Sequence, residues 1–152
     1  MQLDSYICTN SHIRNIMKSV VICSSQRFKK EVDDFAKKLE KLGVPLVLAP
    51  DFRYRTAKVA AAPESVRLKS ASYRKGLEGL VRAHLHRIQK ADVCFIYNKK
   101  GYVGYNTTLE LGAAAILGKL IFALEEDTHE PCRHILFDKI IKTPEDLARY
   151  LV

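Results

Sequence analysis

Hydrophobic residues along this chain alternate between short continuous runs and longer stretches with helical spacing. The continuous runs lie at 19–23, 44–48, 92–97 and 119–124, with a shorter one inside 135–141. Such runs indicate strands buried on both faces, as in a parallel sheet. The helical spacing covers 27–42, 77–90, 107–117 and 144–151. This alternation predicts an α/β fold, a doubly wound parallel sheet of about five strands.

Capping residues support several of these boundaries. Ser25 is a suitable N-cap for the first helix, and Gly43 ends it. Thr143 followed by Pro144 predicts the start of the closing helix. Between the second strand and the second helix, residues 51–74 show no clear period, so we expect a long loop there.

The length of 152 residues suits one domain. We expect an N-terminal arm over residues 1–17, which lack a period, and a single domain over 18–152. No segment reaches the ~20 apolar residues of a membrane span. The first 17 residues have no secretory-signal pattern, so the expected location is the cytoplasm.

The net charge of +8 favours anionic partners such as nucleotides. Much of the excess lies in the irregular stretch, on Arg53, Arg55, Lys58, Arg67, Lys69, Arg74 and Lys75. A solvated basic loop explains this stretch, and a lid or phosphate clamp is the functional alternative. The sequence has no helix-turn-helix, zinc-finger or aromatic sheet signature, so it does not favour nucleic acid as a partner.

The four cysteines show irregular spacing and no CxxC pair. Cys23 and Cys94 lie inside predicted strands, where a free cysteine behaves as a small buried hydrophobe. Cys132, His129 and His134 lie near one another on a polar loop, which is more typical of surface residues than of ligands. We therefore expect no metal site.

Ligands of doubly wound sheets bind beyond the carboxyl ends of the strands, where the strand order reverses. For the order 2-1-3-4-5 that point lies between the first and third strands. The loops after these strands, 24–27 and 98–105, each lead into a helix N-terminus that favours an anion. The predicted ligand-binding residues are Ser24, Ser25, Arg27, Asn98, Gly101, Tyr102, Gly104, Asn106, Thr107 and Thr108. The tyrosines at 97, 102 and 105 are candidates for stacking on a base or sugar.

Glu110 admits two interpretations. It lies three residues after Thr107, so the two can form a capping box at the start of a helix. Alternatively, Glu110 is a carboxylate facing the crevice, acting as a nucleophile or stabilising a developing cation.

Several short strings follow one another in order: Ala91-Asp-Val-Cys-Phe-Ile, Gly101-Tyr-Val-Gly, Thr108-Leu-Glu-Leu-Gly with Ala114, and Leu117-Gly-Lys. Together with Cys23-Ser-Ser and Arg27, they resemble the nucleoside 2-deoxyribosyltransferase family and the related 2'-deoxynucleoside 5'-monophosphate N-glycosidases. The resemblance covers roughly 18 to 124. It implies a flavodoxin-like sheet, a homodimer or larger oligomer, and no cofactor or metal.

The resemblance also implies cleavage of an N-glycosidic bond through a covalent glycosyl–carboxylate intermediate, with Glu110 at the position of the nucleophile. Members of the family carry an aspartate on the helix before the third strand, where it assists proton transfer. Counting back from Asp92, this place falls at His84. Histidine can do acid–base work near neutral pH, so His84 is the second candidate catalytic residue.

These observations favour an enzyme that cleaves or transfers the N-glycosidic bond of a nucleoside or nucleotide. The alternative is a non-catalytic nucleotide-binding or sensing domain on the same fold, which would explain the missing aspartate. A nucleic-acid binder is a weaker alternative, and a redox or flavin role rests on fold analogy alone.

Overall fold

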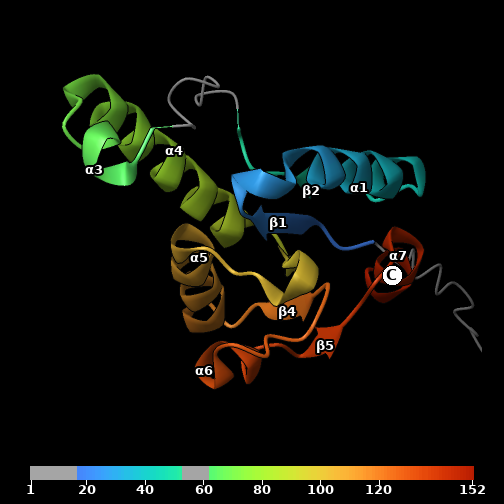
Figure 1. Ribbon diagram of the computed structural model, residues 1–152. Coiled ribbons are helices and arrows are strands. Elements are labelled where there is room, and N and C mark those ends of the chain that lie inside the picture. Colours follow the sequence, from blue (N-terminus) through green and yellow to red (C-terminus); the bar gives the residue numbers. More distant parts are fainter. Residues whose placement is uncertain (1–16, 53–61) are drawn as a thin grey trace, which may run out of the picture.

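The computed structural model describes residues 17–52 and 62–152, and a parallel sheet of order β2-β1-β3-β4-β5 forms its centre (Figure 1). The strands are β1 (Val20–Ser24), β2 (Val47–Leu48), β3 (Val93–Tyr97), β4 (Leu120–Ala123) and β5 (Lys139–Ile140). Every neighbouring pair is parallel. The predicted fold class and strand order are therefore confirmed.

Helices cover both faces of this sheet. They are α1 (Lys29–Lys41), α3 (Glu64–Arg67), α4 (Ala71–Lys90), α5 (Tyr105–Ile116), α6 (Pro131–His134) and α7 (Pro144–Tyr150), with 3-10 turns η1 (Gln26–Phe28) and η2 (Lys99–Gly101). Helix α1 contacts α7, and α4 contacts α5. None of the helices within the described residues is long and apolar enough to cross a membrane.

Strand β1 shows why two separate layers of core form. Its side chains alternate between the faces, as in any strand. Val20 and Ile22 pack with residues of α1 and α7, whereas Val21 and Cys23 pack with residues of α4 and α5. Since all of β1 is buried, both faces must be apolar, which is why the sequence shows a continuous run instead of an alternating one.

The irregular region is more ordered than the sequence predicts. Helix α3 lies inside it, and α4 begins at Ala71 instead of Leu77. Ser70 caps α4, because its hydroxyl accepts a hydrogen bond from the backbone N–H of Tyr73 at 3.3 Å. The first turns of α4 are largely exposed and lack the apolar spacing that would reveal them. The basic residues 53, 55 and 58, like residues 1–16 of the predicted arm, lie outside the described residues.

The start of α5 overturns the capping-box interpretation of Glu110. Gly104 is the N-cap residue and Thr107 lies inside the helix. Glu110 is therefore in the second turn, too far along for a first-turn cap. Thr108 takes up the local bonding instead, since its hydroxyl donates to the Gly104 carbonyl at 3.1 Å.

Candidate active site

Three polar side chains from three different elements meet under helices α4 and α5. Cys23 comes from the end of β1, His84 from α4 and Glu110 from α5. The Sγ of Cys23 lies 3.5 Å from Nε2 of His84, and this Nε2 lies 3.8 Å from Oε2 of Glu110. The two predicted catalytic residues, far apart in sequence, are therefore neighbours in space.

The cluster is shielded from water. The His84 side chain is 6% exposed and that of Glu110 17%, while Cys23 is completely buried. Oε2 of Glu110 is buried and has no hydrogen-bond partner among the described residues. An unpaired buried carboxyl oxygen is rare and points to a role beyond packing.

Burial dominates the electrostatics of this cluster. It raises the pKa of Glu110 to about 8, and the nearby Cys23 thiol offsets this only in part. Burial, assisted by the charge of Arg87, lowers the pKa of His84 to about 4, with the Ile22 backbone acting in the opposite direction. Near pH 7 the two side chains therefore face each other mostly as neutral groups, and their contact is not an ion pair.

Burial also raises the pKa of the Cys23 thiol well above its usual range, and the neighbouring Cys94 and Glu110 act in the same direction. The Sγ of Cys94 lies 3.7 Å from that of Cys23. Both thiols are free and buried, as the sequence predicts. The sequence pattern predicted only that both are core residues. Nothing in the spacing of the cysteines indicated that Cys23 contacts His84.

The two loops predicted to line the crevice lie side by side. Ser25 is the N-cap of η1 and accepts from the backbone N–H of Arg27. The guanidinium carbon of Arg27 lies 3.4 Å from the centre of the Tyr102 ring. The Cβ of Ser25 is 3.9 Å from the place where a Cβ on Gly104 would lie. Loop 24–27 and loop 98–105 thus form one continuous rim.

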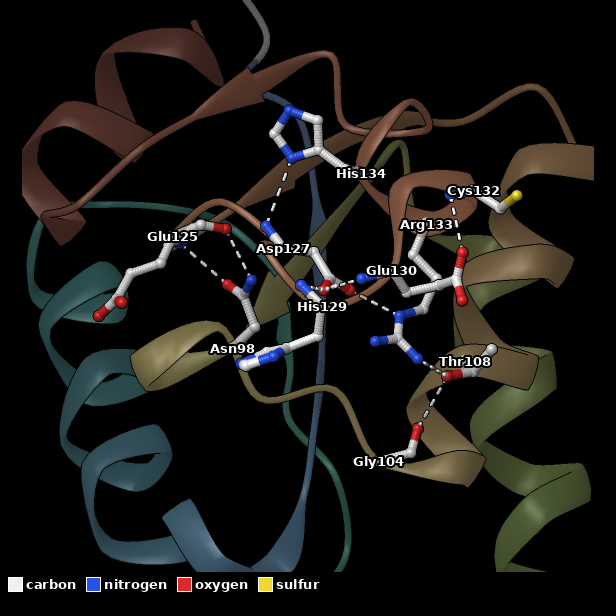
Figure 2. A network of polar contacts seen from close by, with 10 residues as sticks. All are labelled: Asn98, Gly104, Thr108, Glu125, Asp127, His129, Glu130, Cys132, Arg133 and His134. Carbon is white, nitrogen blue, oxygen red and sulfur yellow. Dashed lines mark hydrogen bonds and ion pairs between the residues drawn. The ribbon is translucent and has the colours of Figure 1, made fainter.

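Other predicted ligand-binding residues are already engaged within the protein. Asn98 is fully buried, and its side chain exchanges two hydrogen bonds with the backbone of Glu125, at 2.6 and 2.9 Å (Figure 2). Ser24 donates to the Tyr97 carbonyl at 3.0 Å. Gly101 approaches the backbone of Glu126. Thr107 is buried, whereas Asn106 is exposed.

The predicted stacking tyrosines separate in the structure. Tyr97 is 8% exposed and packs edge-on against Phe35 in the core. Tyr105 is 95% exposed on the outer side of α5. The ring of Tyr102 lies between the two loops of the rim, in contact with the guanidinium of Arg27.

A partly buried ion pair, in which the Asp127 side chain is fully buried and that of Arg133 is 21% exposed, holds the loop after β4. The sequence did not reveal it. Nε of Arg133 donates to Asp127 at 2.6 Å, and Arg133 also reaches the Thr108 hydroxyl at 3.5 Å (Figure 2). Asp127 further accepts from the backbone N–H groups of His129 and Glu130, each at 3.0 Å. This network links the loop to the start of α5.

Cys132, His129 and His134 do not form a set of metal ligands in the part of the chain that the structure describes. The one such set there comprises Cys23, His84 and Glu110. His134 instead accepts from the backbone N–H of Asp127, and Cys132 is exposed.

A cavity of about 930 Å³ opens at the carboxyl ends of β3, β4 and β5. Its lining includes Lys99, Lys100 and Lys142, but also the acidic Glu125 and Glu126. Neither Glu110 nor His84 lines it. The cavity and the buried cluster are therefore separate features of the same sheet edge.

No protein-family model and no curated protein matches this chain. Among solved structures, it is similar to a 2-deoxyribosyltransferase of Bacillus psychrosaccharolyticus, with 22% identity and a TM-score of 0.55 over 87% of this chain and 91% of that one. This likeness shows the shared fold. The fold implied by the resemblance of the sequence motifs is therefore present.

Two further structures align with TM-scores of 0.49. One is a CMP N-glycosidase of Clostridium botulinum, with 17% identity over 88% of this chain and 97% of that one. The other is a conserved protein of Enterococcus faecalis V583, with 14% identity over 89% of this chain and 97% of that one.

Proposed function

We propose that this protein cleaves or transfers the N-glycosidic bond of a nucleoside or nucleotide, with Glu110 as the nucleophile. The observation that carries the proposal is a buried carboxyl group with an unpaired oxygen, beside a histidine, at the edge where parallel sheets bind ligands. The matching sequence motifs and the fold shared with a 2-deoxyribosyltransferase support the choice of reaction.

In the proposed reaction, the ionised Glu110 attacks the anomeric carbon of the sugar as the bond to the base breaks. The base leaves with the bonding electron pair and takes up a proton, and the sugar becomes an ester of Glu110. A water molecule or a second base then attacks the same carbon and restores the carboxylate. The transition states resemble an oxocarbenium ion, which a carboxylate in a desolvated site stabilises strongly.

His84 enters this scheme as a neutral imidazole. With a pKa near 4 it is a poor proton donor to the leaving base at neutral pH. It can accept a hydrogen bond from an incoming water and orient it toward the ester. Its Nε2, 3.8 Å from Oε2 of Glu110, would have to move closer, as catalytic contacts often do when substrate binds.

Access is the main structural demand of the proposal. Because Oε2 of Glu110 is buried, a substrate reaches it only if the side chains that cover it move. The guanidinium of Arg27, stacked on Tyr102 at the exposed rim, is suited to a substrate phosphate. We therefore include nucleoside monophosphates in the substrate class.

A binding or sensing function without turnover is the second candidate, and one observation favours it. A carboxyl group with a pKa of about 8 carries its proton for much of the time at neutral pH and is then a weak nucleophile. This candidate predicts tight nucleotide binding without release of free base.

The test is a turnover assay with ribo- and deoxyribonucleosides and their monophosphates, quantifying free base and exchanged nucleoside by chromatography. Glu110→Gln should lower turnover by roughly 1000-fold or more while its circular dichroism spectrum is unchanged. Glu78→Gln is the matched control, because Glu78 is 63% exposed and its ion pair among the described residues is the exposed one with Arg82 on α4. Absence of base release from every substrate, with or without an acceptor base, would refute glycosidic-bond chemistry for this panel.

We also propose that the protein forms a homo-oligomer through α5. Tyr105, Leu109 and Ile116 are 95%, 65% and 89% exposed and recur with helical spacing on one side of the helix. An exposed apolar stripe of this kind is typical of a protein interface.

A further inference from the structure

The thiol, imidazole and carboxyl of Cys23, His84 and Glu110 form a compact set of three different donor atoms. Sγ, Nε2 and a carboxylate oxygen all lie within 4.8 Å of one another. They come from β1, α4 and α5, so the packing of both helices on the sheet holds the set together. Two of the three residues are buried and the third is partly buried.

The spacing of these atoms suits a tetrahedral zinc ion. With Zn–S near 2.3 Å and Zn–N and Zn–O near 2.0–2.2 Å, a tetrahedron places sulfur about 3.5–3.7 Å from a nitrogen or oxygen ligand, and nitrogen about 3.3–3.6 Å from oxygen. The observed distances are 3.5 Å from Sγ to Nε2 and 3.8 Å from Nε2 to Oε2 of Glu110. Small side-chain shifts would therefore complete the geometry.

The charges also favour a divalent cation. A thiolate and a carboxylate together neutralise two positive charges, and the imidazole binds in its neutral form, so the loaded site carries no net charge into the core. A thiolate and an imidazole select zinc-type ions over magnesium and calcium, which prefer oxygen ligands alone. The buried Oε2 that lacks a partner among the described residues would gain one.

We propose that Cys23, His84 and Glu110 form a binding site for a zinc-type divalent cation, contrary to the sequence expectation of no metal. Binding displaces the protons of the Cys23 thiol and the Glu110 carboxyl, which pass to solvent. Cys94, whose Sγ is 3.7 Å from that of Cys23, lies beside the set but is not one of the three ligands. The three residues leave the fourth position of a tetrahedron to a water molecule that enters the buried cluster with the ion.

The site has a consequence for activity that rests on the proposed function. A carboxylate bound to the cation cannot attack the sugar, so zinc should inhibit base release. Because Cys23 helps to hold the ion on the Glu110 carboxylate, inhibition by zinc should depend on the Cys23 thiol. Removal of the ion by a chelator should restore turnover.

The binding test uses cobalt as a spectroscopic substitute for zinc in the full-length protein, first stripped of metal with a chelator. One equivalent of Co²⁺ should produce a thiolate-to-cobalt charge-transfer band in the near ultraviolet and the intense visible bands of four-coordinate cobalt. Added zinc should displace the cobalt ion, so that the charge-transfer band and the visible bands both disappear. Cys23→Ser should abolish the charge-transfer band, because it removes the thiolate. His84→Gln should abolish the visible bands of four-coordinate cobalt. Each variant should weaken zinc binding by on the order of 100-fold or more.

Cys132→Ser and Cys8→Ser are the matched controls and should leave the spectrum unchanged, as should Cys94→Ser. Circular dichroism checks that each variant folds, and Cys23→Ala replaces Cys23→Ser if the hydroxyl is not tolerated in the core. Absence of a charge-transfer band in the wild-type protein, or its loss in Cys132→Ser or Cys8→Ser with retention in Cys23→Ser, would overturn the proposal.

Base release measured with chelator and with added zinc separates the two proposals. Inhibition by zinc that disappears in Cys23→Ser supports both. Cobalt bands without any base release uphold the metal site and refute the enzymatic function for the panel. Base release without cobalt bands supports the enzymatic function and refutes the metal site.

Discussion

At the scale of single residues, Glu110 illustrates how position changes chemistry. An exposed glutamate at this point of a helix would be an ordinary ionised side chain. Under α4 and α5 it is desolvated, its Oε2 has no hydrogen-bond partner among the described residues, and its pKa is about 8. The same burial that makes the carboxyl reactive when ionised also makes its ionisation costly.

This cost predicts a pH-dependent effect of Glu110→Gln on stability. Because the pKa of Glu110 is higher in the folded protein than the usual 4.5, its favourable contribution is complete below pH 4.5 and is lost as the pH rises through about 8. Near pH 9 the variant should therefore be more stable than wild type, by up to about 5 kcal/mol. Urea unfolding with a chelator present measures this, and an equal difference at pH 4 and pH 9 would contradict it.

Asp127 represents the opposite case. Burial would raise its pKa, but Arg133 and the backbone N–H groups of His129 and Glu130 outweigh burial and hold the pKa below its usual value. A group of this kind stabilises the fold above its unfolded pKa near 3.8, and the contribution is lost as the pH falls through the folded pKa.

Asp127→Asn should consequently destabilise the protein by about 2–4 kcal/mol at pH 7, because it leaves Arg133 without its charged partner. The loss should shrink below pH 4. Asp33→Asn, which breaks the exposed pair with Lys29, should cost less than about 0.5 kcal/mol. Similar losses in the two variants, measured by urea unfolding, would show that Asp127 has no special role.

At the scale of elements, the turn η2 connects β3 to the rim of the site. Gly101 adopts φ +69°, and an added Cβ would lie 3.1 Å from the carbonyl oxygen of Glu126. Asn98 meanwhile binds the backbone of Glu125. The end of β3 is thus held against the end of β4, which fixes where loop 98–105 begins.

Gly101→Ala should therefore cost about 1–3 kcal/mol of stability through backbone strain and the close carbonyl. Gly79→Ala makes the same chemical change inside α4, where an added Cβ meets nothing within 4 Å, and should stabilise by up to about 1 kcal/mol. Thermal unfolding of both variants provides the comparison. Equal changes in the unfolding temperature of the two variants would contradict the prediction, because the close contact at Gly101 would then cost no stability.

At the scale of the whole molecule, the two faces of the sheet differ in the chemistry of the side chains that they bury. The face under α1 and α7 is an aromatic and aliphatic core, with Phe35 stacked on Phe95 at 4.9 Å. The other face holds the cluster of Cys23, His84 and Glu110. Helix α5, which carries Glu110, turns its apolar stripe of Tyr105, Leu109 and Ile116 outward. Assembly through this stripe would cover the outer side of α5, the helix that carries Glu110 on its inner side.

Leu109→Glu should therefore shift the protein toward monomer, because a charge at the centre of an apolar interface is left desolvated. Val66→Glu is the matched control, since Val66 is a similarly exposed residue, at 55%, on the distant helix α3. Sedimentation velocity at micromolar concentration distinguishes the states. A wild-type protein that already sediments as a monomer would refute assembly through α5.

Local pattern was sufficient for the order and type of most elements. The continuous apolar runs at 19–23 and 92–97 predicted strands buried on both faces, which the structure places at 20–24 and 93–97. Thr143-Pro144 predicted the start of α7, where the Thr143 hydroxyl accepts from the Asp146 N–H at 3.1 Å. These features depend on neighbours within a few residues. The sequence also indicated His84 and Glu110 as a pair of candidate catalytic residues, because the resemblance of its short motifs implied a carboxylate at Glu110 and an acid–base group at the place of His84.

Packing over long sequence distances settled the rest. The thiol of Cys23 looked like any strand cysteine, and only the crossing of α4 and α5 over β1 brings it to His84 and Glu110. The capping-box prediction failed because the helix begins at Tyr105, where Gly104 and the Thr108 hydroxyl complete its first turn. The shifted pKa values of Glu110 and His84 follow from desolvation, a property of the folded surroundings that no local pattern contains.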